Sequence, residues 1–254
     1  MCNLYTTPSA DEFEQYMKTL DIVLGEELRD GWPSKPIGPF GWAPFLTSAG
    51  SSHLDLKLGQ WGMIRRGQAE RIAYMRPSST SGKRTSAPKP ISTNNARIES
   101  IDQKPTFSQA WRLGHRCLIP AAWYAEPNWE TGQNIWWHLK RADGLPWFLA
   151  GLWSEWTDQA TGELVPNFTM ITCNCDAHPL LSRLHKPDPR LPADQQDKRS
   201  LVHIDTQDWE QWLHGTTADA MSLIKPQAAS QFDQADAQAT THRLESGHAN
   251  GNLF

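Results

Sequence analysis

The stretch between residues 116 and 172 decides the fold, because it contains four runs of strand-forming residues separated by turn residues. The runs read RCLI at 116–119, IWWHL at 135–139, WFLAGLW at 147–153 and NFTMIT at 167–172. The turns between them are Thr131-Gly132, Ala142-Asp143-Gly144 and Thr161-Gly162. Runs of β-branched and aromatic residues joined by short turns are typical of hairpins, so we predict an antiparallel sheet here.

Helices are expected on both sides of this stretch. Ser9 and Glu12 form a capping box ahead of apolar residues at helical spacing, which predicts a helix over 10–20. Two short helices are expected near 207–213 and 217–224. The sequence therefore predicts an α+β fold, a single domain with a curled, barrel-like antiparallel sheet and peripheral helices.

The remaining segments are expected to be loops and a tail. Residues 31–52 are punctuated by Gly and Pro, which indicates loop with short extended pieces. Residues 78–90 are small, polar and basic, which indicates a mobile surface loop. Beyond Pro226 the chain is rich in Gln, Ala, Asp, Ser and Gly, which predicts disorder. We thus expect one domain over 1–225 and a polar C-terminal tail over 226–254.

Composition argues against a membrane protein and against a disulfide framework. No run of about 18 apolar residues is present, and the segment after Met1 lacks the basic and apolar parts of a secretory signal. A cytoplasmic location is therefore expected, where the cysteines are not expected to pair. The spacing of Cys173, Cys175 and His178 lacks the second ligand pair of a closed zinc site. We expect no metal and no cofactor.

Charge is distributed unevenly along the chain. The net charge is −4, yet residues 65–116 contain eleven Lys and Arg against three Asp and Glu. A basic block within an acidic protein predicts a site for a polyanion, although a solvated basic loop would have the same composition. Trp61 and Trp111 flank the block, and aromatic rings beside cations suit single-stranded nucleic acid.

Cys2 is the first candidate for chemistry. If Met1 is removed, Cys2 carries a free α-amine, with a pKa of about 7.7–8.0, beside a thiol with a pKa near 8.5. The amine can form a Schiff base with an aldehyde, and the thiol can then close a five-membered thiazolidine. The alternative is that Cys2 is an incidental terminal residue.

Three further segments contain candidate groups. Asn95 and Arg97 lie two residues apart, and an amide beside a guanidinium can orient a sugar and bind a phosphate. Glu126 lies among aromatic residues, an environment that raises the pKa of a carboxyl group and suits proton transfer. His185 is a natural proton shuttle near neutral pH. Each of these residues, taken alone, could equally be an ordinary loop or surface residue.

Together and in this order, these elements resemble the SOS response-associated peptidase (SRAP) family, which shields abasic sites in single-stranded DNA. The matching motifs are Met1-Cys2, Trp61-Gly62-Met63-Ile64, Asn95-Ala96-Arg97-Ile98-Glu99, Arg116-Cys117-Leu118-Ile119-Pro120-Ala121 with Glu126, and His185 before Arg190-Leu191-Pro192. The chain departs from the family at Trp123, Pro127 and Arg65, and it has three more residues between His185 and Arg190 than the commoner pattern.

This resemblance implies an abasic-site sensor that forms a covalent thiazolidine crosslink through Cys2, with peptidase and lyase-like chemistry. It implies catalytic roles for Cys2, Asn95, Glu126 and His185. The expected DNA-binding residues are Trp61, Arg65, Arg84, Arg97 and Arg190. The expected partner is single-stranded DNA containing abasic sites, which would place the protein at the nucleoid when bound, while its protein partners at the replication fork are left open.

Two other functions remain open from the sequence. An N-terminal-nucleophile amidotransferase would use Cys2 to attack a glutamine amide, and it would release ammonia. A non-covalent single-stranded DNA binder would use the Trp and Arg residues alone.

Overall fold

Ten strands and five α-helices form the part of the chain that the computed structural model describes, residues 1–20, 22, 31–48, 54–75 and 87–249. The strands are β1 Tyr5–Thr6, β2 Trp42–Ser48, β3 Leu54–Trp61, β4 Asn95–Arg97, β5 Arg116–Ala121, β6 Trp123–Asn128, β7 Ile135–Leu139, β8 Trp147–Thr157, β9 Leu164–Asn174 and β10 Arg199–Leu201. The helices are α1 Ala10–Thr19, α2 Ser108–Arg112, α3 Trp209–His214, α4 Thr217–Ser222 and α5 Ala235–Ala249.

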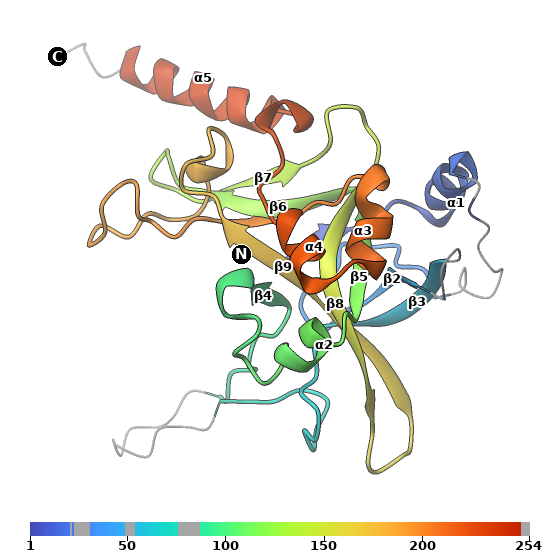
Figure 1. Cartoon of the computed structure of the whole chain (residues 1–254). Helices are drawn as coiled ribbons and strands as arrows, with labels where there is room; N and C mark the ends of the chain where they lie inside the picture. The colour runs from blue at the N-terminus through green and yellow to red at the C-terminus, as the bar shows by residue number, and fades with distance from the viewer. Residues whose placement is uncertain (21, 23–30, 49–53, 76–86, 250–254) are drawn as a thin grey trace, which may run out of the picture.

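The larger sheet closes on itself. Its strands run in the order β10-β9-β3-β2-β5-β8, and β8 pairs again with β9, so that β9, β3, β2, β5 and β8 form a barrel (Figure 1). The barrel is narrow enough to require glycine at close approaches. A Cβ atom on Gly59 of β3 would lie 2.5 Å from the Pro166 carbonyl oxygen of β9, so β3 and β9 can approach this closely only with glycine at that position.

A smaller sheet attaches the N-terminal segment to the barrel. Its order is β1-β6-β7, all antiparallel. Tyr5 pairs with Tyr124, and the Ala125 amide donates to the Leu4 carbonyl at 2.9 Å, so the antiparallel pairing continues toward Cys2. Because the two strands run in opposite directions, this pairing brings the first residues of the chain alongside Glu126.

Two apolar clusters fill the molecule on either side of the barrel wall. The first contains Cys2 and the rings of Tyr5, Trp61, Tyr124 and Trp147. The second packs α1, α2, α3 and α4 against the outside of the barrel, with Phe13, Phe148 and Trp212 among its buried residues (Figure 1). These clusters give the short helices most of their stability, since helices of five or six residues are marginal alone.

The sequence predictions are largely confirmed for the fold. The class, the barrel-like sheet and the peripheral helices are present, and all four predicted strands correspond to β5, β7, β8 and β9. The Ser9–Glu12 capping box opens α1, and the two late helices are α3 and α4. The expected all-antiparallel pairing is wrong in two places, because β3 and β4 each run parallel to β9.

The expected disordered tail is wrong over much of its length. Residues 226–249 contain helix α5 and a buried anchor, since Phe232 is 2% exposed and its ring centroid lies 5.0 Å from that of Trp147. The expected loop over 31–52 contains β2, and residues 78–86 of the expected mobile loop lie outside the described residues. No helix among the described residues is both long and apolar enough to cross a membrane.

Candidate active site

Three groups converge at the start of the chain. The Met1 amine lies 2.6 Å from His185 Nε2 and 3.5 Å from Glu126 Oε2. His185 Nε2 in turn lies 2.8 Å from Glu126 Oε2. An amine, a carboxylate and an imidazole within hydrogen-bonding reach of one another form a constellation suited to proton transfer.

Two neighbouring amides fix the backbone at Cys2. Asn95 Nδ2 donates to the Cys2 carbonyl at 2.7 Å, and Asn94 Nδ2 donates to the same oxygen at 3.1 Å. Asn95 is positioned by the parallel pairing of β4 with β9, and the Asn94 carbonyl accepts from the Met170 amide of β9 at 3.0 Å. The larger sheet, through these two asparagines, therefore fixes the Cys2 carbonyl. Strand β1, which belongs to the smaller sheet, fixes the residues that follow.

The Cys2 side chain is fully buried. Its Sγ donates to the Leu4 carbonyl at 3.3 Å. Burial, reinforced by the negative charge of Glu126, raises the pKa of this thiol well above its usual range. The thiol is therefore protonated at neutral pH, and a nitrogen at this position would be the first nucleophile.

Glu126 lies in a strand, and not in a loop as the alternative interpretation of the sequence had it. It belongs to β6, pairs with Trp137 of β7 and is 2% exposed. Strand β6 is buried because the N-terminal segment covers one edge and β7 the other. A carboxylate is rarely buried without partners, and here the Met1 amine and His185 provide them.

His185 is held in an unusual backbone conformation. Its φ is +63°, its amide donates to the Pro127 carbonyl at 2.6 Å, and Lys198 Nζ donates to both the Leu184 and the His185 carbonyls at 2.6 Å. A positive φ at a non-glycine residue is uncommon and persists where its surroundings enforce it. These contacts keep the imidazole over Glu126.

Trp61 does not provide the stacking surface that the sequence suggested. The residue is 0% exposed in β3, its ring packs edge-on against Tyr5 at 4.9 Å, and its Nε1 donates to the Asn94 carbonyl at 2.9 Å. A fully buried ring cannot stack on a base. Trp61 instead supports Asn94, which supports Cys2.

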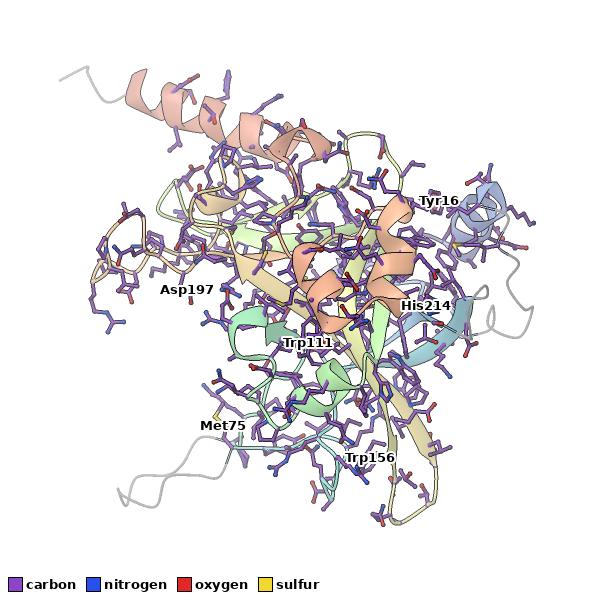
Figure 2. All side chains as sticks on the ribbon, in the orientation of Figure 1. Tyr16, Met75, Trp111, Trp156, Asp197 and His214 are labelled. Atoms are coloured by element: carbon purple, nitrogen blue, oxygen red, sulfur yellow. The ribbon has the colours of Figure 1, made fainter. Side chains whose placement is uncertain are left out.

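The predicted DNA-binding arginines lie on separate segments of the chain. Arg97 lies on β4 two residues after Asn95 and forms an ion pair with Asp197, the residue labelled beside β4 in Figure 2. Arg190 is exposed and paired with Asp188 at 2.7 Å, and Arg65 is exposed in the segment after β3. Arg84 lies outside the described residues.

Sequence reasoning missed two supporting residues. Asn94 is fully buried and binds Cys2, and the tandem Asn94-Asn95 was the only local signal for it. Lys198 is 7% exposed and orders the backbone at His185 from a distance of thirteen residues, for which the sequence holds no signal. Among the described residues no group of three side chains is arranged as ligands for a metal ion.

Solved structures share this fold. A protein from Bordetella bronchiseptica is 27% identical with a TM-score of 0.70, over 91% of this chain and 97% of that one. A protein from Bacteroides thetaiotaomicron is 19% identical with a TM-score of 0.62, over 91% and 90%. A phage-related protein from B. bronchiseptica is 17% identical with a TM-score of 0.56, over 91% and 92%. At such low identity, the last two similarities show only that the fold is shared.

The family comparison covers nearly the whole chain. No curated protein is similar enough to match it. The model of the SOS response associated peptidase family, however, matches residues 1–242, which include the convergent residues at the N-terminus and the first part of α5. The chain therefore belongs to the SOS response associated peptidase (SRAP) family, which associates it with the response to DNA damage and, at the level of the family, with peptidase-type chemistry.

Proposed function

We propose that this protein captures abasic sites in single-stranded DNA by forming a thiazolidine between mature Cys2 and the aldehyde of the base-free deoxyribose. The observation that carries the proposal is the position of the chain's first amine, 2.6 Å from His185 and 3.5 Å from Glu126, on the residue directly before Cys2. Removing Met1 transfers the free amine to Cys2, about one 3.8 Å Cα spacing further along the chain. The space that Met1 occupies would then receive the sugar.

The reaction balances with the loss of one water. The closed sugar first opens, which breaks its C1–O4 bond, gives O4 a proton and leaves an aldehyde. The Cys2 amine adds to the aldehyde carbon, and water leaves to give a Schiff base. The thiol then adds across the C=N bond, sulfur bonding to carbon and its proton going to nitrogen. The raised pKa of the Cys2 thiol supports this order, with the amine reacting first.

Each polar residue of the site has a role in this scheme. Glu126 accepts the proton that the attacking amine loses and returns it to the departing water. His185 donates to the sugar oxygen as the ring opens, and it can carry the proton from the thiazolidine nitrogen back to sulfur when the bond is reversed. Asn95 keeps the Cys2 backbone fixed, and Arg97 binds an adjacent phosphate.

Met1 must leave by hydrolysis of the Met1–Cys2 peptide bond before this chemistry can begin. One route is self-processing, in which the Cys2 sulfur attacks the Met1 carbonyl and water cleaves the resulting thioester, with Glu126 and His185 moving the protons. The other is removal by a separate aminopeptidase. Peptidase-type chemistry at the level of the family favours the first route.

The decisive experiment uses a single-stranded oligonucleotide with one uracil, which is excised to leave an abasic site. The full chain, with removal of Met1 verified by intact mass, is incubated with this strand and run on a denaturing gel. We expect a shifted band that is absent with Cys2→Ala and strongly reduced with Glu126→Gln. Cys173→Ala is the matched control, since Cys173 is buried in the second apolar cluster and Cys2 in the first.

The Cys2→Ser variant distinguishes the carbon–nitrogen bond of the adduct from its carbon–sulfur bond. It keeps the amine and lacks the thiol, so we expect an adduct only after reduction with borohydride. An equally stable adduct from Cys2→Ala, or none from the processed wild-type chain, would contradict the proposal. Release of ammonia from glutamine without any adduct would instead support the amidotransferase. Equal binding of abasic and intact strands without any adduct would support the non-covalent single-stranded DNA binder.

A further inference from the structure

A pocket opens beside His185. It has a volume of about 490 Å³, within the roughly 300–1,000 Å³ of small-molecule sites, and is lined by Trp129, His185, Pro187, Leu191 and Lys198 among others. His185 also contacts the chain's first amine. The pocket therefore shares His185 with the proposed reaction site, and the nucleotide next to the abasic one is the part of the DNA within its reach.

The segment 185–198 forms one wall of the pocket and is internally braced. The Gln196 side chain donates to the carbonyls of Asp188, Leu191 and Pro192 at 3.2, 3.0 and 2.9 Å, and its oxygen accepts from the Asp188 amide at 2.7 Å. Lys198 anchors the other end. This wall contains the three additional residues between His185 and Arg190, so the pocket is a feature of this chain's own loop.

Trp129 provides a flat apolar wall. The residue follows β6, is half-buried, and has Lys186 Nζ 5.0 Å from its ring centroid. The Lys186 ammonium therefore lies over one electron-rich face of the ring, and a base that stacks there would displace it toward the neighbouring phosphate. Partly exposed aromatic rings stack on nucleobases without strong preference for sequence.

Charge around the pocket suits a phosphodiester strand. Arg183 neutralises Glu130 at 2.8 Å, and Arg190 neutralises Asp188 at 2.7 Å. Among the described residues neither Lys186 nor Lys198 forms an ion pair with a carboxylate. The pocket edge is therefore left with positive charge, which a phosphate next to the bound base would neutralise.

We propose that this pocket binds the base of the nucleotide next to the abasic sugar, with that base stacked on Trp129 and its phosphate at Lys186. The inference rests on the proposed function and extends it from the reacting sugar to a neighbouring base. The site thus reads an intact nucleotide beside the lesion, and it requires that nucleotide for fast capture.

The test compares three abasic oligonucleotides. One has ordinary bases on both sides of the abasic site, and the other two carry a base-free tetrahydrofuran spacer on the 5′ or on the 3′ side. The initial rate of adduct formation is measured below saturation. We expect one spacer to slow capture by the wild-type protein about ten-fold, which also identifies the side that the pocket reads.

Trp129→Ala should slow capture of the fully based strand by the same factor and leave the rate with that spacer strand unchanged. Trp129→Phe keeps a stacking ring and should restore most of the rate. Trp136→Ala is the matched control, because Trp136 is 50% exposed on β7 and does not line the pocket. A variant that failed to fold would lose activity on all three strands equally.

Two results would overturn the inference while the proposed function stands. Either the wild-type protein captures all three strands at the same rate, or a Trp129→Ala protein with the same unfolding midpoint as the wild type is slowed equally on all three. A wild-type protein that forms no adduct with any strand would overturn both the pocket's role and the proposed function, so the two failures are distinguishable.

Discussion

Asp197 determines what Arg97 can bind in the free protein. Its carboxylate bonds to Arg97 and, through the other oxygen, to Arg199 at 3.2 Å. Arg199 is also paired with Glu99 at 2.8 Å, so it has a second carboxylate available. Arg97 has no other ion pair among the described residues, and in the proposed function a DNA phosphate must compete with Asp197 for it.

Asp197→Asn should therefore strengthen binding of intact single-stranded DNA. The neutral amide competes less well for the guanidinium, so we expect a decrease of several-fold in Kd at low salt, measured by fluorescence anisotropy. Asp143→Asn is a matched control, since Asp143 is equally exposed at 45% and is paired with Arg141. Unchanged affinity would show that Arg97 does not bind phosphate.

His203 is a residue whose burial should affect stability rather than chemistry. It is 8% exposed among the rings of Trp147, Tyr124 and Phe232, at centroid distances of 4.4, 5.6 and 5.6 Å. Neither ring nitrogen has a hydrogen-bond partner among the described residues. Burial, with smaller contributions from Arg141 and His178, lowers the pKa of His203 from 6.5 to about 3. The imidazole is neutral in the folded protein.

This lowered pKa predicts a loss of stability on acidification. Below pH 6.5 the unfolded chain takes up a proton that the folded chain excludes, so the free energy of unfolding falls as the pH falls toward about 3. Relative to His203→Phe, the wild type should lose about 1.4 kcal/mol per pH unit between pH 6 and 4, measured by urea unfolding. His242→Gln, at an exposed position of α5, should follow the wild type. If the free energy of unfolding changed with pH equally in the wild type and in His203→Phe, this account would be contradicted.

At the scale of elements, α5 is attached through a few specific contacts. Trp137 of β7 is buried, and its Nε1 donates to Thr240 Oγ1 at 2.9 Å. The Asp236 carboxylate accepts from the His138 amide at 2.7 Å, and Arg183 donates to Thr241 Oγ1 at 3.1 Å. The helix therefore covers the smaller sheet, which also contains Glu126 (Figure 1).

Thr240→Val should destabilise the protein by about 1–3 kcal/mol. Valine has nearly the same shape, but it leaves the buried Trp137 N–H without an acceptor. The measurement is the midpoint of chemical unfolding with tryptophan fluorescence as the probe. Ser246→Ala on the exposed side of the same helix should change the free energy of unfolding by less than about 0.5 kcal/mol. A similar effect of both substitutions would place α5 outside the cooperative unit.

Elements with a local signal could be predicted from sequence, and those defined by distant partners could not. The hairpin turns and the Ser9 capping box act within a few residues, so β7, β8 and α1 were predictable. Strand β6 contains Pro127 and a buried acid, and it becomes a strand because β1 and β7 pair with it. The helix α5 is too polar to indicate burial. It is held by Trp137 from far along the chain, and Phe232, just before the helix, packs against Trp147.

At the scale of the molecule, the candidate site is assembled from four separate parts of the chain. Cys2, Asn95, Glu126 and His185 were predictable because short motifs marked them, and the structure brings them together. The role of Trp61 was mistaken because composition cannot tell a stacking ring from a buried one. The charge asymmetry remains the main whole-molecule prediction, with the block over 65–116 as the expected polyanion surface.

Encounter with DNA should depend strongly on salt. For intact single-stranded DNA, the logarithm of the association constant should fall linearly with the logarithm of salt concentration, and Arg65→Gln should reduce the slope by about 0.7 if Arg65 binds one phosphate. Lys140→Gln, an exposed cation outside the block, should leave the slope unchanged. The completed adduct should persist at any salt. An unchanged slope in Arg65→Gln would remove Arg65 from the DNA path.

In the proposed function the protein is joined to DNA at its second residue, and the short pairing of β1 with β6 then has a mechanical consequence. Tension on the strand, for example from a translocating motor, would enter the fold at Cys2 and act first on the two amide contacts from Asn94 and Asn95 and on the two-residue strand β1. These few bonds would yield one after another, while the closed barrel behind them carries no load. A pulling experiment should therefore show an early, low-force extension of the N-terminal segment before the barrel itself ruptures.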